Sequence, residues 1–188
     1  MNLLLVLFSI ISFNTFADTL PIYPNDKLTP GAVDPTVTED SIINHTFSTK
    51  TVRLVPSFVI IDVYKKYGIV KNTGTCGKTS EHCEVDHRVS CENGGICGLL
   101  KDANGKAIND PKRVALLESN LWPQIYEGKV DDPNRLKICG AHAKDKLENK
   151  LASLVRSRTI TLKQDQEVLM GDWVAGYKKY VDPKGCDK

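Results

Sequence analysis

The sequence predicts an α+β protein in which a strand hairpin and a following helix form the core, with further helices packed around it and disulfides holding it together. Three observations lead to this expectation. Apolar residues recur at helical spacing in the segments 57–67 and 141–180. Between these segments, Val85, His87 and Val89 alternate with polar residues, as in a half-buried strand. The chain also contains six cysteines.

Caps and turns place the first elements. A helix is expected over PSFVIIDVYKKYG, because Pro56 suits the first helical position and Gly68 suits the C-terminal cap. The segment EVDHRVS follows as a short strand and runs into a double-glycine turn. Asp110 and Pro111 then predict the cap and first residue of a short helix that ends near Glu118.

The last third of the chain is expected to be mostly helical. The segment LWPQIYEGKVDDPNRLKICG reads as a loop, because prolines and a glycine punctuate it. A helix with an apolar stripe should begin at Ala141. A second should begin at Thr161, which forms a capping box with Gln164, and continue through Tyr180.

The first 17 residues predict a signal peptide. An uncharged apolar run extends from Leu3 to Phe13, and a small residue, Ala17, stands after it. This run is too short to span a bilayer, so cleavage after Ala17 is expected. The mature chain should therefore be secreted or periplasmic, with no membrane segment. Residues 18–52, rich in proline and polar residues, should form an extended N-terminal arm over the core.

The net charge and the cysteine content exclude few classes of function. The formal net charge of +2 is too small to indicate a nucleic-acid partner by itself. Cysteines in an exported chain favour disulfides. A zinc site made by the first four cysteines is the alternative, but their spacing lacks the paired short knuckles of zinc ribbons. The disulfide candidates are Cys76, Cys83, Cys91, Cys97, Cys139 and Cys186.

Polar residues suited to metal-assisted chemistry follow one another along the chain. Asp86 and His87 lie in the predicted strand, Asn120 lies in SNLWPQ, and His142 lies at the start of the helix AHAKDKLEN. A strand-borne histidine can face a helix that follows a glycine turn. A carboxylate oxygen of Asp86 and an imidazole nitrogen of His142 would hold one metal ion and leave other positions to water and phosphate oxygens.

These residues resemble the HNH, or His-Me finger, nuclease superfamily, whose core is a ββα-metal hairpin plus helix. The pieces VDH, SCENGG, NLWP, AHAKDKLENKL and DWV occur in the order found in a group of small bacterial HNH-like proteins. The likeness extends from about Val52 to Val181. It implies an HNH-like nuclease domain over residues 53–188 that hydrolyses phosphodiester bonds, with DNA expected more than RNA.

The resemblance also implies a role for each site residue. His87 would be the general base, and Asn120 would brace the loop that orients it. Asp86 and His142 would hold the metal, since a kinked strand end brings Asp86 to the side of the base. Magnesium or manganese is expected, and the histidine also admits zinc or nickel. Further candidate ligands on the helix are Asp145 and Asn149.

Two departures from the superfamily pattern affect the expected site. An insertion of about 24 residues, at about 96–119, separates Gly95 from Asn120, where relatives have only a few. It would either shape a substrate groove or displace Asn120. In addition, Cys91 takes a position that is usually aliphatic, and a bridge between Cys91 and Cys97 or their neighbours would staple the enlarged turn.

Basic side chains supply candidate phosphate contacts, although a solvated helix face explains several of them equally well. These candidates are Arg88, Lys144, Lys146 and Lys150. The alternative to a nuclease is a catalytically silent, disulfide-stapled secreted binding protein on the same fold. Geometry separates the two: a nuclease needs Asp86, His87 and His142 around one site. No inhibitor, immunity protein or oligomeric state follows from the sequence.

Overall fold

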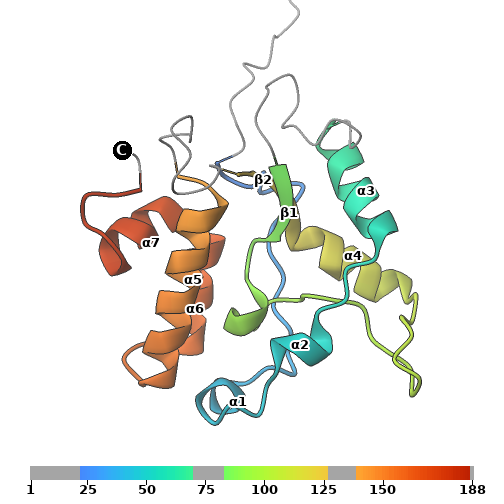
Figure 1. The fold of residues 1–188 in the computed structure, drawn as a ribbon, viewed down its shortest axis with the longest axis horizontal. Coiled ribbons are helices and arrows are strands. Elements are labelled where there is room, and N and C mark those ends of the chain that lie inside the picture. The colour runs from blue at the N-terminus through green and yellow to red at the C-terminus, as the bar shows by residue number, and fades with distance from the viewer. Residues whose placement is uncertain (1–21, 70–82, 127–138, 187–188) are drawn as a thin grey trace, which may run out of the picture.

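The computed structural model describes residues 22–69, 83–126 and 139–186 (Figure 1). The expected signal peptide and Cys76 lie outside these residues. The fold is α+β, as predicted. Its elements are α1 (Glu39–Ile43), α2 (Thr49–Val52), α3 (Ser57–Lys66), β1 (Cys83–His87), the 3₁₀ helix η2 (Cys91–Asn93), α4 (Pro111–Ser119), β2 (Leu121–Ile125), α5 (Ala141–Arg156), α6 (Leu162–Met170) and α7 (Trp173–Tyr180).

The two strands form an antiparallel pair between two groups of helices. The register runs from Cys83 opposite Ile125 to His87 opposite Leu121. The sequence predicted a loop where β2 lies, and that prediction is wrong. Pro123 suggested a break, but in a two-stranded sheet both strands are edges, where a residue without an N–H is tolerated. The burial of every residue of β2 stabilises the strand.

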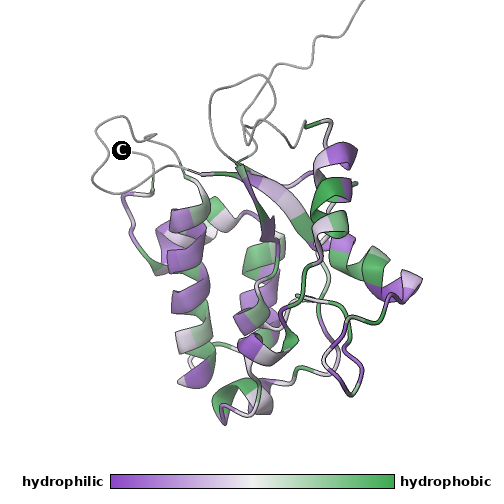
Figure 2. Ribbon diagram, turned by 45° about the vertical axis from the view of Figure 1, so that its right-hand side comes forward, coloured by the Kyte–Doolittle hydropathy of each residue, from purple (hydrophilic) through white to green (hydrophobic). Residues whose placement is uncertain are grey.

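Two apolar clusters fix the helices on either side of the strands (Figure 1). One contains residues of α5, α6 and α7, including Leu147, Leu169 and Trp173. The other joins α3 and α4 to β2, through residues such as Val63 and Leu117. Figure 2 shows hydrophilic and hydrophobic residues on the same helices, as expected of helices that pack on one side and face solvent on the other.

The predicted helices at 57–67, 111–118 and from 141 are confirmed, with small differences at their ends. Pro56 is the N-cap of α3 rather than its first residue. The capping box of Thr161 and Gln164 is also present. The predicted single helix from Thr161 through Tyr180 is wrong, because it divides into α6 and α7 at Gly171 and Asp172. The Asp172 carboxylate accepts a hydrogen bond from the Ala175 N–H at 2.9 Å and so caps a new helix.

The N-terminal segment crosses the core and contains α1 and α2, which the sequence pattern did not predict. Its backbone lies against the glycine turn: Val33 bridges to Gly95, and the Ile96 N–H donates to the Ala32 carbonyl at 2.9 Å. The segment therefore helps to hold the loop that follows β1. None of the described helices combines the length and the apolar character needed to cross a membrane.

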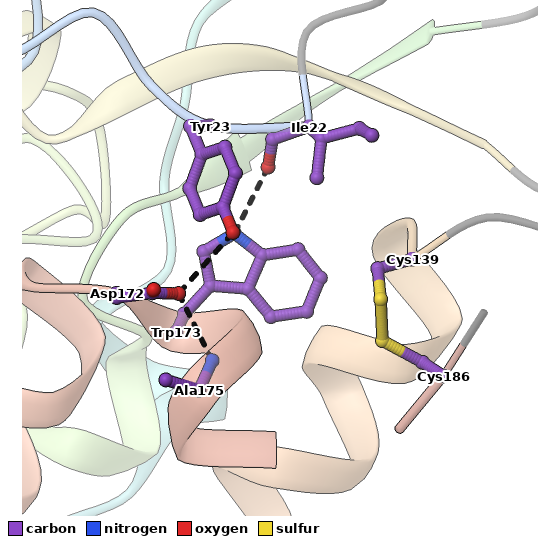
Figure 3. The surroundings of a disulfide bond; sticks show 7 residues. All are labelled: Ile22, Tyr23, Cys139, Asp172, Trp173, Ala175 and Cys186. Carbon is purple, nitrogen blue, oxygen red and sulfur yellow. Dashed lines mark hydrogen bonds between the residues drawn. A yellow bond between two sulfur atoms is a disulfide. The ribbon is translucent and has the colours of Figure 1, made fainter. Parts of the chain in front are cut away.

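A disulfide joins Cys139, two residues before α5, to Cys186 at the end of the described chain (Figure 3). Beside it, the Trp173 indole N–H donates to the Ile22 carbonyl at 2.9 Å. Cys83 is also disulfide-bonded. Cys91 and Cys97 are free thiols, both buried, so the structure does not form the bridge that the sequence suggested between them. A zinc site of Cys76, Cys83, Cys91 and Cys97 would need the Cys83 thiolate, which the disulfide consumes.

Candidate active site

Asn120 fixes the loop between β1 and η2. Its side-chain oxygen accepts hydrogen bonds from the N–H groups of Ala32, at 3.2 Å, and Val89, at 3.0 Å. Its amide nitrogen donates to the carbonyls of Val89 and Ile96, each at 2.9 Å. The insertion does not carry Asn120 away from this loop, because these hydrogen bonds hold it there between α4, which ends at Ser119, and β2, which begins at Leu121.

The second glycine of SCENGG, Gly95, is required because its Cα lies close to the backbone of Val89 on the other side of the loop. A Cβ on Gly95 would lie 1.9 Å from the Val89 carbonyl oxygen and 3.0 Å from the Asn120 amide nitrogen. No larger side chain fits without moving the backbone. The glycine and the asparagine therefore act together to return the chain toward the end of β1.

His87, at the end of β1, is almost fully buried, with 5% of its surface exposed. Its Nε2 atom is buried and has no hydrogen-bond partner among the described residues. Burial is the main cause that lowers the pKa of His87, the positive charges of Arg53 and Lys144 lower it as well, and Asp86 opposes them, so that the resulting pKa is about 4. At neutral pH the imidazole is therefore uncharged, as a general base must be.

Asp86, the preceding residue, is held by a buried lysine from α5. The Lys144 Nζ lies 2.8 Å from an Asp86 carboxylate oxygen and 2.6 Å from the His87 carbonyl, and it also contacts the Glu148 carboxylate. Burial raises the pKa of Asp86, but the lysine outweighs that effect and the pKa lies below its ordinary value. Asp86 is thus ionised, with 18% of its side chain exposed.

Glu148 differs from Asp86 in the direction of its pKa shift, although both carboxylates contact Lys144. Burial raises the pKa of Glu148 well above its ordinary value, and the Asp86 charge raises it further, against the opposing effect of Lys144. The buried Lys144 ammonium therefore forms ion pairs with two carboxylates. The opposing carboxylates raise the pKa of Lys144 above its ordinary value despite burial, so the ammonium stays protonated.

Two neighbouring pockets form a cleft beside these residues. One, of about 470 Å³, is lined by Asp86 and His87. The other, of about 460 Å³, is lined by Cys91 and extends along α5. Their linings share Arg53, Asp145 and Glu148. We call this surface the β1–α5 cleft. It carries both an ionised carboxylate and a neutral imidazole, together with an arginine able to contact a phosphate.

The remaining predicted site residues occupy different surroundings. The His142 ring packs on Tyr126, with ring centres 4.6 Å apart, and His142 does not line the cleft. Asp145 lines both pockets and Asn149 lines one. Lys146 and Lys150 are exposed on α5.

Two of the predicted phosphate contacts are buried and already have partners. Lys144 is 1% exposed and bonds to the carboxylates described above. The Arg88 guanidinium donates at 2.6 Å to Asp26 and, at the same distance, to the Thr29 carbonyl, and it also bonds to the Met170 carbonyl. These bonds connect the N-terminal segment to α6, so the role of Arg88 in this structure is to hold these two parts together.

The donors at the cleft fit a hard divalent cation that keeps much of its hydration. Asp86 and Asp145 both line one pocket, and magnesium is commonly held by one or two carboxylates with water and phosphate oxygens. Within the described residues, no three His, Cys, Asp or Glu side chains converge to form a protein cage for a metal.

Sequence reasoning missed three members of the cleft: Arg53, Glu148 and the thiol of Cys91. Glu148 stands four residues after Lys144, a spacing that places both on one helix face, so helical periodicity could have paired them. Nothing local signals Arg53, which ends α2 far from β1 in the chain. No family model, curated protein or solved structure matches this chain.

Proposed function

We propose that this protein is an endonuclease of the HNH type that hydrolyses phosphodiester bonds in the β1–α5 cleft. One observation carries the proposal: the neutral, buried His87 imidazole has an unpartnered nitrogen beside the ionised Asp86. DNA is proposed over RNA on the resemblance of the sequence motifs alone. The ββα-metal core is proposed on the order β1, β2, α5 and on the contact of Asp86 with Lys144 of α5.

In the proposed reaction, the neutral His87 imidazole accepts a proton from the attacking water. Asn120 positions the imidazole by holding Val89 and thereby the end of β1. Arg53 binds a phosphate oxygen, and Lys144 orients Asp86. A divalent cation held by Asp86 and Asp145 would stabilise the charge that develops on the phosphate and on the leaving oxygen.

The test is plasmid nicking by the purified mature protein with magnesium or manganese. His87→Ala and His87→Gln should each reduce the nicking rate by about 10²-fold or more, the typical contribution of a general base. The Gln variant fills the buried site, so circular dichroism should show a retained fold. His45→Gln, at an exposed histidine outside the cleft, is the matched control and should nick at the wild-type rate.

Chelation by EDTA should abolish nicking, and added magnesium or manganese should restore it. Equal rates for the wild-type protein and both His87 variants would exclude the catalytic assignment. Nicking that persists in EDTA would exclude the metal.

Two observations favour a second candidate, a catalytically silent binding protein. His142, which the resemblance places at the metal with Asp86, does not line the cleft. The Lys144 ammonium already neutralises Asp86, at 2.8 Å, where a metal would bind. This candidate predicts no nicking with any divalent metal and no change in thermal stability on adding magnesium or manganese. The nuclease predicts a rise in the melting temperature, because a ligand that binds only the folded state stabilises it.

A further inference from the structure

Cys91 and Cys97 form a buried pair at the wall of the cleft. Cys91 begins η2, and Cys97 follows the double-glycine turn. Their exposed fractions are 1% and 2%. The Gly95 N–H donates to the Ser90 carbonyl at 2.9 Å and closes the turn, so that Cys97 returns to Cys91. The side chains of Cys91 and Cys97 are hydrogen-bonded to each other.

The loop that carries the pair is anchored at both ends. Asn120 binds Val89 and Ile96, the neighbours of the loop ends. The Leu54 N–H donates to the Cys97 carbonyl at 3.4 Å. A disulfide here would close a short loop that is already held in the required conformation, so little chain entropy would be lost when it forms.

Arg53 gives the pair a chemical character that the other cysteines lack. Its side chain hydrogen-bonds to the Cys91 sulfur, and its charge acts on both thiols. The hydrogen bond with Cys97 lowers the pKa of Cys91 to about 7, with Arg53 adding to that effect against burial and the Asp86 charge. The same hydrogen bond, together with burial, raises the pKa of Cys97. Cys91 is thus partly a nucleophilic thiolate at neutral pH, whereas Cys97 stays protonated.

We propose that Cys91 and Cys97 are a redox-active dithiol that exchanges reversibly with a disulfide, with Cys91 as the attacking sulfur and Cys97 as the resolving one. The oxidant is a disulfide, either a small molecule such as oxidised glutathione or a protein disulfide of the exported compartment. Cys91 lines the cleft, which gives the oxidant its approach, whereas Cys97 does not line it.

The exchange balances in two steps. The Cys91 thiolate attacks one sulfur of the oxidant, forming a mixed disulfide and releasing one thiolate. The Cys97 thiol then loses its proton to that thiolate or to solvent and attacks the Cys91 sulfur, which releases the second thiol of the oxidant. Two electrons pass from the cysteine pair to the oxidant, and one intramolecular disulfide remains.

Oxidation also changes the partner of Arg53. A disulfide carries no negative charge, so Arg53 loses its ionic partner and its guanidinium becomes available to the cleft. This consequence rests on the proposed nuclease: the oxidised protein should bind the phosphate of its substrate more tightly and should nick faster than the reduced one.

The test equilibrates the full mature protein in graded mixtures of reduced and oxidised glutathione, followed by alkylation and peptide mass spectrometry. Cys91 and Cys97 should convert together, at ratios where the Cys139–Cys186 disulfide stays oxidised. Cys97→Ser should accumulate a glutathione adduct on Cys91, and Cys91→Ser should form no adduct on Cys97. The proposal would be overturned if Cys91 and Cys97 are reduced, and therefore alkylated, at every glutathione ratio. It would also be overturned if their disulfide resists reduction as strongly as Cys139–Cys186.

Arg53 variants test the origin of the reactivity. Arg53→Gln should slow alkylation of Cys91 several-fold and shift the pair toward the disulfide, because the cation stabilises the reduced thiolate. Arg53→Lys keeps the charge and should retain most of the rate. Lys50→Gln, at an exposed lysine of the same pocket, is the matched control and should change neither quantity.

These measurements distinguish a failure of the dithiol proposal from a failure of the nuclease proposal. Reversible exchange without nicking in either state would sustain the dithiol and exclude the nuclease. Nicking without reversible thiol exchange would support the nuclease and exclude the redox-active dithiol.

Discussion

At the scale of single residues, Lys144 decides the charge balance of the site. Its ammonium lies between the carboxylates of Asp86 and Glu148 and also bonds to the His87 backbone carbonyl. A buried cation shared by two acids contributes little net stability compared with an apolar core, but removing it leaves uncompensated charge. The main effect of the lysine is therefore to fix the position and the charge of the Asp86 carboxylate, and its contribution to the stability of the fold is smaller.

Lys144→Met should lower the free energy of unfolding by about 3 kcal/mol, because Asp86 is left ionised and buried without its partner. Urea denaturation at neutral pH measures the loss. The double variant Lys144→Met/Glu148→Gln should lose less, since one of the two acids is then neutral. Lys146→Met, at an exposed lysine of α5, is the control and should stay within about 0.5 kcal/mol of the wild-type protein. A loss no larger than that of the control would contradict the assigned charge balance.

At the scale of elements, Asp165 joins α6 to η2 and α5. Its carboxylate accepts from the Asn93 amide at 2.6 Å, and the same amide donates to the Glu148 carbonyl of α5 at 3.3 Å. Burial raises the pKa of Asp165 to about 7, against the lowering effect of the Asn93 hydrogen bond, and the Glu92 charge raises it further. The folded state therefore favours the protonated form of Asp165, because burial outweighs the Asn93 hydrogen bond, which favours the ionised form.

This raised pKa predicts a stability that falls as pH rises. The unfolded carboxyl has a pKa of 3.8 and the folded one a pKa of about 7, so the folded state holds the proton more tightly in between. The stabilisation is complete below pH 3.8 and is lost as pH rises through about 7. Asp165→Asn should remove this component.

The difference between wild-type and Asp165→Asn unfolding free energies should change by on the order of 2 kcal/mol between pH 4 and pH 8, in favour of the variant at the higher pH. Comparing the two proteins cancels the opposite contribution of His87, whose lowered pKa is unaffected by the substitution. Glu167→Gln, at an exposed position of α6, should show no such change. A difference that is constant with pH would show that Asp165 titrates normally in the folded state.

At the scale of the whole molecule, the Cys139–Cys186 disulfide ties the start of α5 to the C-terminal end across 47 positions (Figure 3). Cross-linking two distant positions restricts the unfolded chain, and the restriction grows with the length of the closed loop. α5 packs on both α6 and α7, so the bridge closes the helical group that carries Lys144 and Asp145.

Cys139→Ser/Cys186→Ser should lower the free energy of unfolding by about 2–4 kcal/mol, the usual range for a native disulfide that closes a long loop. The double variant leaves no unpaired thiol at either position. Thermal and urea denaturation measure the loss, and nicking at a temperature where the variant is folded should be retained, because neither cysteine lines the cleft. An unchanged stability would show that packing alone closes this helical group.

Much of the local structure could be predicted from the sequence because it depends on near neighbours. The Asp110–Pro111 start of α4, the Thr161–Gln164 capping box and the apolar stripe of α5 are each set by residues within a few positions of one another. The strand position of Asp86 and His87 follows in the same way, from the alternation around them. These features need no knowledge of distant contacts.

The tertiary structure decided what depends on distant partners. β2 forms despite Pro123 because β1 and the apolar cluster bury it. Lys144 lies on Asp86 rather than in solvent, since α5 packs where its ammonium meets two carboxylates. Arg53 reaches Cys91 only through the path of the N-terminal segment. Periodicity and caps encode elements, whereas the side chains that meet in a cleft are selected by long-range packing, which a local pattern does not record.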